Sequence, residues 1–346
     1  MHDGPTFLSL FSGIGGLDLG LERAGWRCVG QVEIDPYRRG ILERWWPDVP
    51  KAEDVREVTE GSLARGLRAV GGSRPDQHAE RARRHGTTDA HPGLICGGFP
   101  CQDLSVAGKR AGLKGARSSL FFEFARIADA VCPTWLLVEN VPGLLSSHGG
   151  RDFAVVLATL ADLGYGVAWR VLDSRYFGVP QRRRRVFVVG HLGVEGPEPF
   201  LPFLEGGEGN PAEGRTTGKG VAGAVAGRSP SRLDDQGTRQ LVSGYTSSGA
   251  GWWDEEDFVR LRAQEGGTPQ NVVAYSTAPA VQYDSAVRRL TPVECCRLQG
   301  FPDDWLGGNE PPDSPKYAAL GDAVTVPVAE WIGERLRAAG LSRRSA

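Results

Sequence analysis

The chain has 346 residues, of which 40% are hydrophobic and 24% are charged, so it can bury a large core with a smaller domain beside it. It has no run of 18 apolar residues and no signal-peptide pattern, so we expect a cytoplasmic protein that does not enter a membrane. The formal net charge of −2 excludes a globally basic surface, and any contact with nucleic acid must therefore be local.

The cysteines do not form a recognisable framework. None of the six belongs to a CxxC pair or has histidine partners at zinc spacing, so we expect neither disulfides nor a bound metal. The six are Cys28, Cys96, Cys101, Cys132, Cys295 and Cys296. The cysteine pattern leaves open whether one of these thiols is reactive.

Strand-like and helix-like segments alternate over the first 190 residues, the pattern of a parallel sheet covered by helices. The expected strands are Thr6–Leu10, Cys28–Glu33, Leu94–Cys96, Trp135–Glu139, Gly166–Asp173 and Arg185–Gly190. Apolar residues at three- and four-residue intervals predict the helices Leu17–Ala24, Pro36–Trp45, Leu120–Ala130 and Phe153–Leu163. The sequence therefore predicts a doubly wound α/β fold of Rossmann type.

The composition changes after residue 191. Residues 192–286 are rich in Gly, Ser, Thr and Pro, which predicts a separate loop-rich domain. Residues 191–286 hold seven Lys and Arg against thirteen Asp and Glu, a balance of −6, so the rest of a chain with net charge −2 carries +4. Helical periodicity returns at 291–299 and 326–338. We expect three parts, 1–191, 192–286 and 287–346, with the last packed back onto the first.

A glycine-rich turn, from Phe11 to Gly16, follows the first expected strand and opens a helix. Its glycines allow a tight turn and let a ligand approach the backbone at a helix N-terminus. The second expected strand ends in Glu33, where doubly wound folds place an acid on a ribose hydroxyl. Together these residues suggest an adenosine cofactor, although a simple turn beside a solvated acid explains them equally well.

Cys101 follows Pro100 on a glycine-flanked turn at the end of the third expected strand. Active sites of open α/β sheets lie at that edge, so this thiol is presented as a nucleophile would be. The other five cysteines fit the usual pattern of a small buried hydrophobe.

Glu139 ends a strongly apolar strand at the same edge of the predicted sheet. An apolar environment raises the pKa of a carboxyl group and allows it to donate a proton near neutrality. Four arginines, 182–185, enter the next strand, whose alternation directs Arg183 and Arg185 toward the site and the other two away. An arginine run is more often a solvated surface, as is the second basic cluster at 81–84.

These four elements, in this order, resemble the motifs of DNA cytosine C5-methyltransferases. Three more segments agree: Asp54-Val55, the run from Arg289 to Pro302, and the run from Leu320 to Val324. The resemblance covers nearly the whole chain apart from 192–286 and an insert near 65–91. It implies a Rossmann-like S-adenosylmethionine-dependent methyltransferase fold, S-adenosyl-L-methionine as cofactor, and double-stranded DNA as substrate. It also implies that residues 192–286 recognise the target sequence, and we expect a monomer.

The resemblance implies a cofactor site in which Phe11 packs on the adenine, Glu33 binds the ribose and Asp54 accepts from the adenine amino group. The expected cofactor-binding residues are Phe11, Gly13, Gly15, Gly16, Glu33, Ile34, Asp54, Val55, Pro100 and Asp322.

The implied chemistry begins with addition of the Cys101 thiolate to C6 of cytosine. Because a free cysteine has a pKa of roughly 8.5, the site must favour the anion, and Arg183 and Arg185 supply positive charge. Glu139 holds N3 and donates a proton, and Arg185 also holds O2 of the base. C5 then takes the methyl group, loses its proton, and the thioether eliminates.

The cytosine must leave the duplex to react, so the family's mobile loop is expected to close over it. This loop corresponds to residues 102–119. The expected DNA contacts are Gln102, Lys109, Arg110, Arg117 and Gln181.

Asp322 departs from the family pattern, which has asparagine at this place near the transferred group. A carboxylate there faces the sulfonium of the cofactor. It could alter cofactor choice or slow transfer, but we expect near-normal use of S-adenosylmethionine.

Two other functions remain open from the sequence. A tRNA cytosine methyltransferase shares the fold, although the Pro100-Cys101-Gln102 sequence and the long variable region favour DNA. A catalytically inactive DNA-binding regulator would be expected to lack Cys101 or Glu139, and both are present.

Overall fold

The computed structural model describes residues 4–59, 92–100, 120–193, 200, 203, 272–275, 278–283, 286–307 and 313–342, and for 272–289 and 341–342 it describes the backbone alone. Its centre is a seven-stranded sheet of order β3-β2-β1-β4-β5-β7-β6. The strands are β1 (Thr6–Leu10), β2 (Arg27–Val32), β3 (Lys51–Ala52), β4 (Leu94–Gly98), β5 (Trp135–Asn140), β6 (Tyr165–Asp173) and β7 (Arg184–Leu192). All six predicted strands and the α/β class are thus confirmed, and β3 was not predicted.

One strand departs from the expected parallel sheet. β7 pairs antiparallel with both β5 and β6, whereas the remaining pairs are parallel. Residues 174–183 connect β6 to β7 and contain only the short helix η6 (Ser174–Phe177). A parallel neighbour would need a crossover of a dozen or more residues, so the short connection imposes the reversal.

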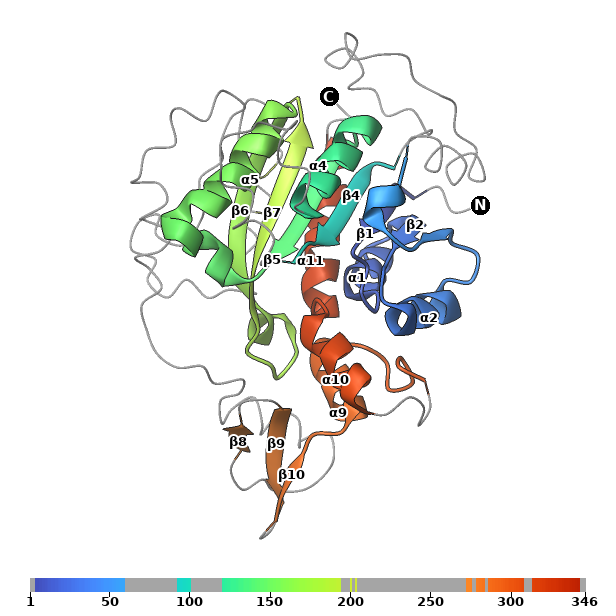
Figure 1. The fold of residues 1–346 in the computed structure, drawn as a ribbon, viewed down its shortest axis with the longest axis vertical. Helices are drawn as coiled ribbons and strands as arrows, with labels where there is room; N and C mark the ends of the chain where they lie inside the picture. Colours follow the sequence, from blue (N-terminus) through green and yellow to red (C-terminus); the bar gives the residue numbers. More distant parts are fainter. Residues whose placement is uncertain are drawn as a thin grey trace.

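Helices cover both faces of this sheet (Figure 1). The four predicted helices of the first part are α1 (Gly16–Arg23), α2 (Pro36–Trp45), α4 (Leu120–Val131) and α5 (Arg151–Asp162). The C-terminal part adds α9 (Pro292–Gln299), α10 (Asp313–Asp322) and α11 (Val326–Ser342), of which α10 was not predicted. Short helices η1 (Val55–Glu57), η4 (Pro142–Leu145) and η5 (Ser147–Gly150) follow β3 and β5.

Local signals explain where several helices begin and end. Asp35 caps α2 by accepting from Arg38 N at 3.0 Å, and Pro36 occupies the first turn. Thr291 and Glu294 form a reciprocal capping box at the start of α9, which ends at Gly300 in the left-handed conformation.

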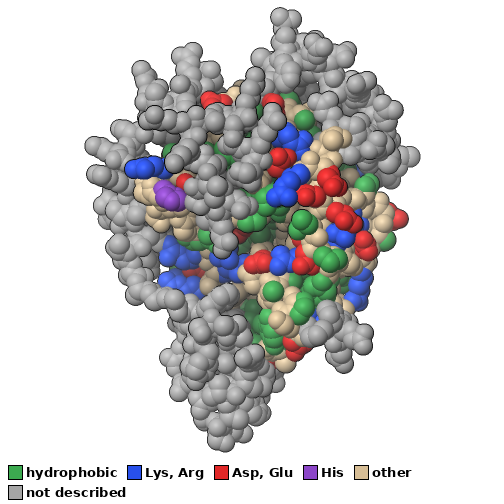
Figure 2. Space-filling model, in the orientation of Figure 1, with side chains coloured by type: hydrophobic (Ala, Val, Ile, Leu, Met, Phe, Trp, Pro, Cys, Tyr) green, Lys and Arg blue, Asp and Glu red, His purple; other side chains and the backbone are tan. Residues whose placement is uncertain are grey.

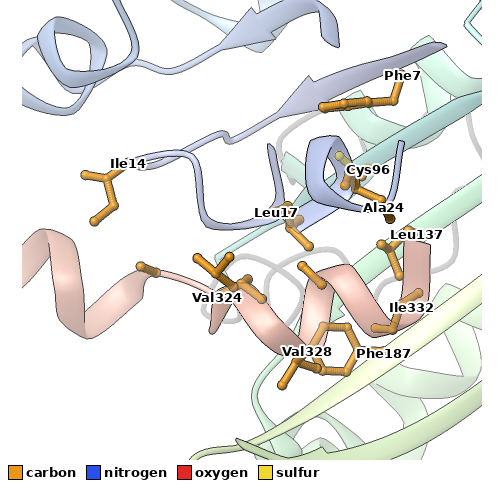
Figure 3. Close-up of a cluster of buried hydrophobic side chains, with 14 of the residues drawn as sticks. Phe7, Ile14, Leu17, Ala24, Cys96, Leu137, Phe187, Val324, Val328 and Ile332 are labelled. Atoms are coloured by element: carbon orange, nitrogen blue, oxygen red, sulfur yellow. The ribbon is translucent and has the colours of Figure 1, made fainter. Parts of the chain in front are cut away.

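The core consists of two apolar layers, one on each face of the sheet. One layer joins the sheet to α4 and α5, and the other joins it to α1, α2 and the C-terminal helices. In the second layer, Leu17 of α1 and Ile332 of α11 lie among the buried side chains drawn in Figure 3. Phe200 and Phe203 belong to the same layer, although they follow the domain boundary predicted at 191.

The C-terminal helix α11 packs directly on α1. The Trp26 indole N–H donates to Gly333 O at 2.9 Å, and Arg337 donates to Ala24 O at 2.9 Å. Gly20 permits this approach, because a Cβ atom there would lie 2.4 Å from the Ala329 Cβ. The end of the chain therefore supports the helix that follows the glycine turn.

Three further strands lie within or next to the region predicted to form a separate domain. They are β8 (Val272–Tyr275), β9 (Ala278–Tyr283) and β10 (Ala286–Arg289), paired antiparallel in the order β10-β9-β8. Across the described part of the chain, each helix is too short or too polar to cross a bilayer.

Candidate active site

The glycine turn lies at the carboxyl end of β1. Phe11 has a φ of 55°, a left-handed conformation that is uncommon for a large side chain. Gly15 has a φ of 85°, and a Cβ atom there would lie 2.6 Å from the Trp46 ring. The Trp305 indole N–H donates to Ile14 O at 2.8 Å and braces the turn from the C-terminal part. A tightly supported turn is what the glycine pattern predicted.

Glu33 is held by the turn that it faces. Its carboxylate accepts from Gly13 N at 2.7 Å and from Asp35 N at 2.9 Å. Apart from the neighbours of Gly13 in the chain, no atom of the described residues lies within 4 Å of the position that a Gly13 Cβ atom would occupy, so this side of the turn is open among them. Next to Glu33, the Ile34 side chain is 66% exposed. An open backbone turn, a fixed carboxylate and an exposed apolar side chain fit a ribose and its adenine.

Asp54 begins the short helix η1 after β3. Its carboxylate accepts from Arg56 N at 2.9 Å, and Val55 behind it is buried. Arg126 of α4 donates to Val55 O at 3.1 Å, a contact that the sequence did not suggest. The loop expected to hold the adenine is therefore anchored to the layer that contains α4 and α5.

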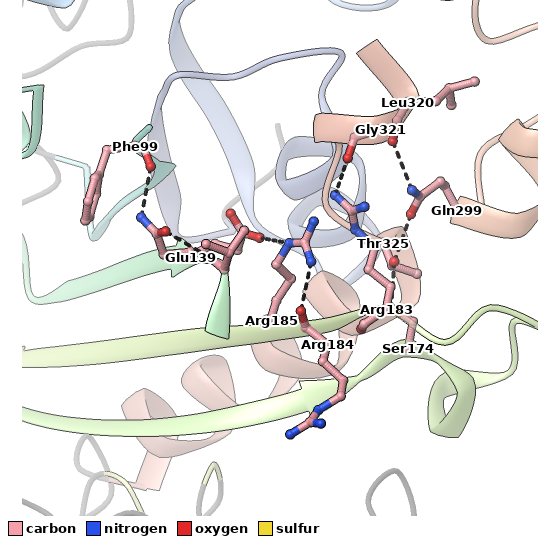
Figure 4. Close-up of polar contacts among 12 residues, drawn as sticks. Phe99, Glu139, Ser174, Arg183, Arg184, Arg185, Gln299, Leu320, Gly321 and Thr325 are labelled. Atoms are coloured by element: carbon pink, nitrogen blue, oxygen red, sulfur yellow. Dashed lines mark hydrogen bonds and ion pairs between the residues drawn. The ribbon is translucent and has the colours of Figure 1, made fainter. Parts of the chain in front are cut away.

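Glu139 is buried at the end of β5, where the sequence predicted it. Arg185 Nε lies 3.0 Å from Glu139 Oε1, as drawn in Figure 4. Burial raises the pKa of Glu139 above its ordinary value, while Arg185 and Arg183 oppose this shift. Gly98 of β4 makes room for the carboxyl group, because a Cβ atom there would lie 2.6 Å from Glu139 Oε2. The expected direction of the pKa shift is confirmed.

Arg183 lies beside this pair and is almost fully buried. Its Nη2 donates to Gly321 O at 2.8 Å. Burial and the neighbouring Arg185 lower the pKa of Arg183 to about 9, so the guanidinium stays charged at neutral pH. Among the described residues, Arg183 Nε and the buried Gln181 Oε1 have no hydrogen-bond partner. The unpaired Arg183 Nε, on a guanidinium that acts on Glu139, fits a polar ligand.

A series of hydrogen bonds links the C-terminal part to Ser174 in the connection between β6 and β7 (Figure 4). Ser174 and Thr325 hydroxyls lie 2.8 Å apart, and Thr325 donates to Gln299 Oε1 at 2.9 Å. Gln299 in turn donates to Leu320 O at 3.0 Å. These contacts hold Gly321 where it accepts from Arg183.

The remaining two arginines of the run point the other way, as the strand alternation predicted. Arg182 Nε lies 3.8 Å from Asp173 Oδ2, and Arg175 shares the same carboxylate at 3.6 Å. In the space-filling view, basic side chains line part of a hollow near the middle of the visible face (Figure 2).

Asn140, the last residue of β5, directly follows Glu139. Its Nδ2 donates to Phe99 O at 2.9 Å, and its Oδ1 accepts from Val141 N at 2.8 Å. Asn140 thus connects the end of β5 to the turn that carries the exposed Pro100. Cys101 follows this turn but lies outside the described residues, as do Gln102, Lys109, Arg110 and Arg117.

Four of the other cysteines are buried thiols, as expected, whereas Cys132 is only half-buried. Burial raises the pKa of Cys28 and Cys96, and it raises those of Cys295 and Cys296 to about 12. These four are poor nucleophiles at neutral pH. In the described part of the chain, no group of three or more His, Cys, Asp or Glu is placed to hold a metal ion.

Asp322 is exposed at the end of α10 and forms an ion pair with Arg38 of α2. Arg38 Nη2 lies 2.5 Å from Asp322 Oδ2. Arg38 was not predicted to belong to the site, because the sequence of α2 has no local feature that indicates a partner in the C-terminal part.

Comparisons with known proteins agree with this geometry. The family model of C-5 cytosine-specific DNA methylases matches residues 5–205 and 228–338. The type II methyltransferase M2.BsuMI of Bacillus subtilis is 30% identical over 343 residues, which cover 95% of this chain and 74% of that protein. The type II methyltransferase M.HhaI of Haemophilus parahaemolyticus is 27% identical over 355 residues, covering 95% and 93%.

Solved structures show the same fold. The Dnmt2 methyltransferase of S. pombe superposes with a TM-score of 0.56 at 18% identity, covering 96% of this chain and 98% of that one. With the family model matching most of its length, the chain belongs to the C-5 cytosine-specific DNA methylase family, and it is a DNA cytosine-5 methyltransferase that uses S-adenosylmethionine.

Proposed function

We propose that this enzyme methylates C5 of a cytosine flipped out of a specific duplex DNA sequence, with Cys101 as a covalent nucleophile. The observation that carries this proposal is the buried Glu139 carboxyl beside Arg185, with the buried Arg183 guanidinium, whose Nε has no partner among the described residues, close enough to affect its pKa. A cytosine ring offers N3 to a proton donor, O2 to a guanidinium, and an exocyclic amine to an acceptor oxygen.

The reaction begins when the Cys101 thiolate donates its electron pair to C6. Glu139 gives a proton to N3 as negative charge develops on the ring, which its raised pKa favours, and Arg185 holds O2. The bound cofactor supplies a methyl group on a positively charged sulfur, which C5 attacks. N3 then returns its proton to the Glu139 carboxylate, and a base or water removes the C5 proton. The electron pair released forms the C5–C6 double bond and expels the Cys101 sulfur as thiolate.

The cofactor would rest on the open turn between Phe11 and Glu33. Glu33 would accept hydrogen bonds from the ribose hydroxyls, Phe11 and Ile34 would enclose the adenine, and Asp54 would bind its amino group. Gly13 keeps the backbone accessible, and Gly15 and Gly16 let the turn pack closely against Trp46 and Val324. Val55 and Pro100 would complete the walls. These side chains would bind and orient the cofactor, and the chemistry depends on residues at the end of β5 and the start of β7.

DNA contacts are proposed for Gln102, Lys109, Arg110, Arg117 and Gln181, and target recognition for residues 192–286. Exchanging 192–286 for the corresponding segment of a relative should change the methylated sequence and keep cofactor affinity. Unchanged specificity after the exchange would contradict this assignment. From the names of the type II relatives, we infer a role in protecting DNA in a restriction-modification system. We also propose that the enzyme is a cytoplasmic monomer.

Transfer of radiolabelled methyl groups to DNA, with tRNA as the competing substrate, tests the proposal. We expect labelled 5-methylcytosine in DNA, and exclusive labelling of tRNA would contradict it. DNA containing 5-fluorocytosine should trap a denaturation-resistant adduct, because a base can remove a proton from C5 but cannot remove fluorine. Cys101→Ser should abolish the adduct, and its persistence would remove Cys101 from the nucleophile role.

A further inference from the structure

The ion pair between Arg38 and Asp322 joins two ends of the candidate site that are distant in sequence. Arg38 belongs to the first turn of α2, and Asp322 is the last residue of α10, 284 positions later. The Arg38 side chain is 22% exposed and the Asp322 side chain 67% exposed, so the pair lies at the protein surface with its cation largely covered.

On one side, this pair borders the cofactor site. Asp35 caps α2, and its N–H donates to the Glu33 carboxylate. A movement of Arg38 would therefore displace the residues that hold Glu33.

On the other side, the pair borders the catalytic cluster. Gly321, directly before Asp322, accepts from Arg183. The charge of Asp322 adds to the burial that raises the pKa of Glu139, and it partly offsets the burial that lowers the pKa of Arg183. Asp322 is thus within electrostatic reach of the catalytic cluster.

An unpaired carboxylate at this place would attract the cationic sulfur of S-adenosylmethionine but not the neutral sulfur of S-adenosylhomocysteine. We propose that Arg38 is a positioning residue that holds Asp322 and cancels its charge, so that substrate and product cofactors bind without a bias from this carboxylate. The inference rests on the proposed cofactor site, but it concerns the balance between the two ligands and not the methyl transfer itself.

Isothermal titration of the full-length protein with each ligand tests this proposal through the ratio of the two dissociation constants. Arg38→Ala should favour S-adenosylmethionine over S-adenosylhomocysteine by about three- to tenfold, because Asp322 is no longer neutralised. Asp322→Asn should shift the ratio by a similar factor in the opposite direction. The double variant should return to the wild-type ratio.

Three controls separate charge from folding. Arg38→Lys keeps the charge and should keep the ratio. Arg297 in the last turn of α9 and Asp303 after it form a comparable exposed ion pair, and Arg297→Ala or Asp303→Asn should leave the ratio unchanged. Thermal unfolding of each variant shows whether it is folded before titration.

Equal shifts for both ligands in Arg38→Ala and Asp322→Asn, or a double variant that does not restore the ratio, would overturn the proposal. These readouts come from binding alone. A wild-type protein that binds both ligands but fails to methylate DNA would contradict the proposed function and not the role of Arg38.

Discussion

The two halves of the sheet edge are built on different principles. At the cofactor end, the Glu33 carboxylate is held by the backbone N–H groups of Gly13 and Asp35. At the catalytic end, the Glu139 carboxyl is buried and faces the guanidinium groups of Arg185 and Arg183. Backbone donors fix a ligand-binding group with little dependence on other side chains, whereas buried charges tune reactivity but depend on each partner.

The largest effect that should separate the two halves is expected from Glu139→Gln. An amide cannot donate the proton that N3 needs, so kcat should fall by about 10²- to 10⁴-fold. The dissociation constant of S-adenosylmethionine should remain close to wild type, because Glu139 lies outside the cofactor end.

Single-turnover methylation and titration of the cofactor, run on the same preparation, check both parts of this expectation. A variant that loses cofactor affinity in proportion to activity would show that the two ends are not separable.

A buried acid beneath the glycine turn offers a second way to test the contrast, through stability. Asp18 accepts from Ser9 Oγ at 3.0 Å and from Gln31 Nε2 at 2.8 Å. Burial nevertheless raises its pKa from 3.8 to about 6. Because the folded state then binds the proton more tightly than the unfolded state, stability is lost as the pH rises from about 4 to above 6.

The difference between these pKa values corresponds to about 3 kcal/mol. Asp18→Asn should lack this loss, since an amide does not ionise and the Ser9 hydroxyl can rotate to accept from it. Urea unfolding of both proteins at several pH values between 4 and 7 measures the difference. Parallel pH curves for the two proteins would show that Asp18 does not ionise in this range.

The smallest effect is expected at the cofactor end itself, from Glu33→Gln. The amide oxygen still accepts from one backbone N–H group, but the charge that strengthens hydrogen bonds to ribose hydroxyls is lost. Charged hydrogen bonds contribute about 1.5–3 kcal/mol and neutral ones about 1 kcal/mol, so cofactor affinity should fall by roughly tenfold.

With saturating cofactor, kcat of Glu33→Gln should stay within a few-fold of wild type. A collapse of kcat under these conditions would mean that Glu33 contributes to chemistry as well as binding.

Much of the architecture was determined by the sequence alone. Strand periodicity, capping residues and glycine positions act over a few residues, so they predicted six strands and placed Glu33 and Glu139 at the same edge. They also predicted that burial raises the pKa of Glu139, because the apolar run before it belongs to its own strand. Of the elements that were not predicted, β3 is a two-residue strand and α10 is a helix with weak amphipathic character.

Only the tertiary structure decided which distant groups meet. It reversed β7, placed Trp305 under the glycine turn, attached Asn140 to the turn before Cys101, and paired Arg38 with Asp322. None of these contacts leaves a local signature, because each depends on how helices and strands far apart in the chain pack around a common core. Periodicity indicates which face of a helix or strand is buried, whereas the tertiary structure determines which other element packs against that face.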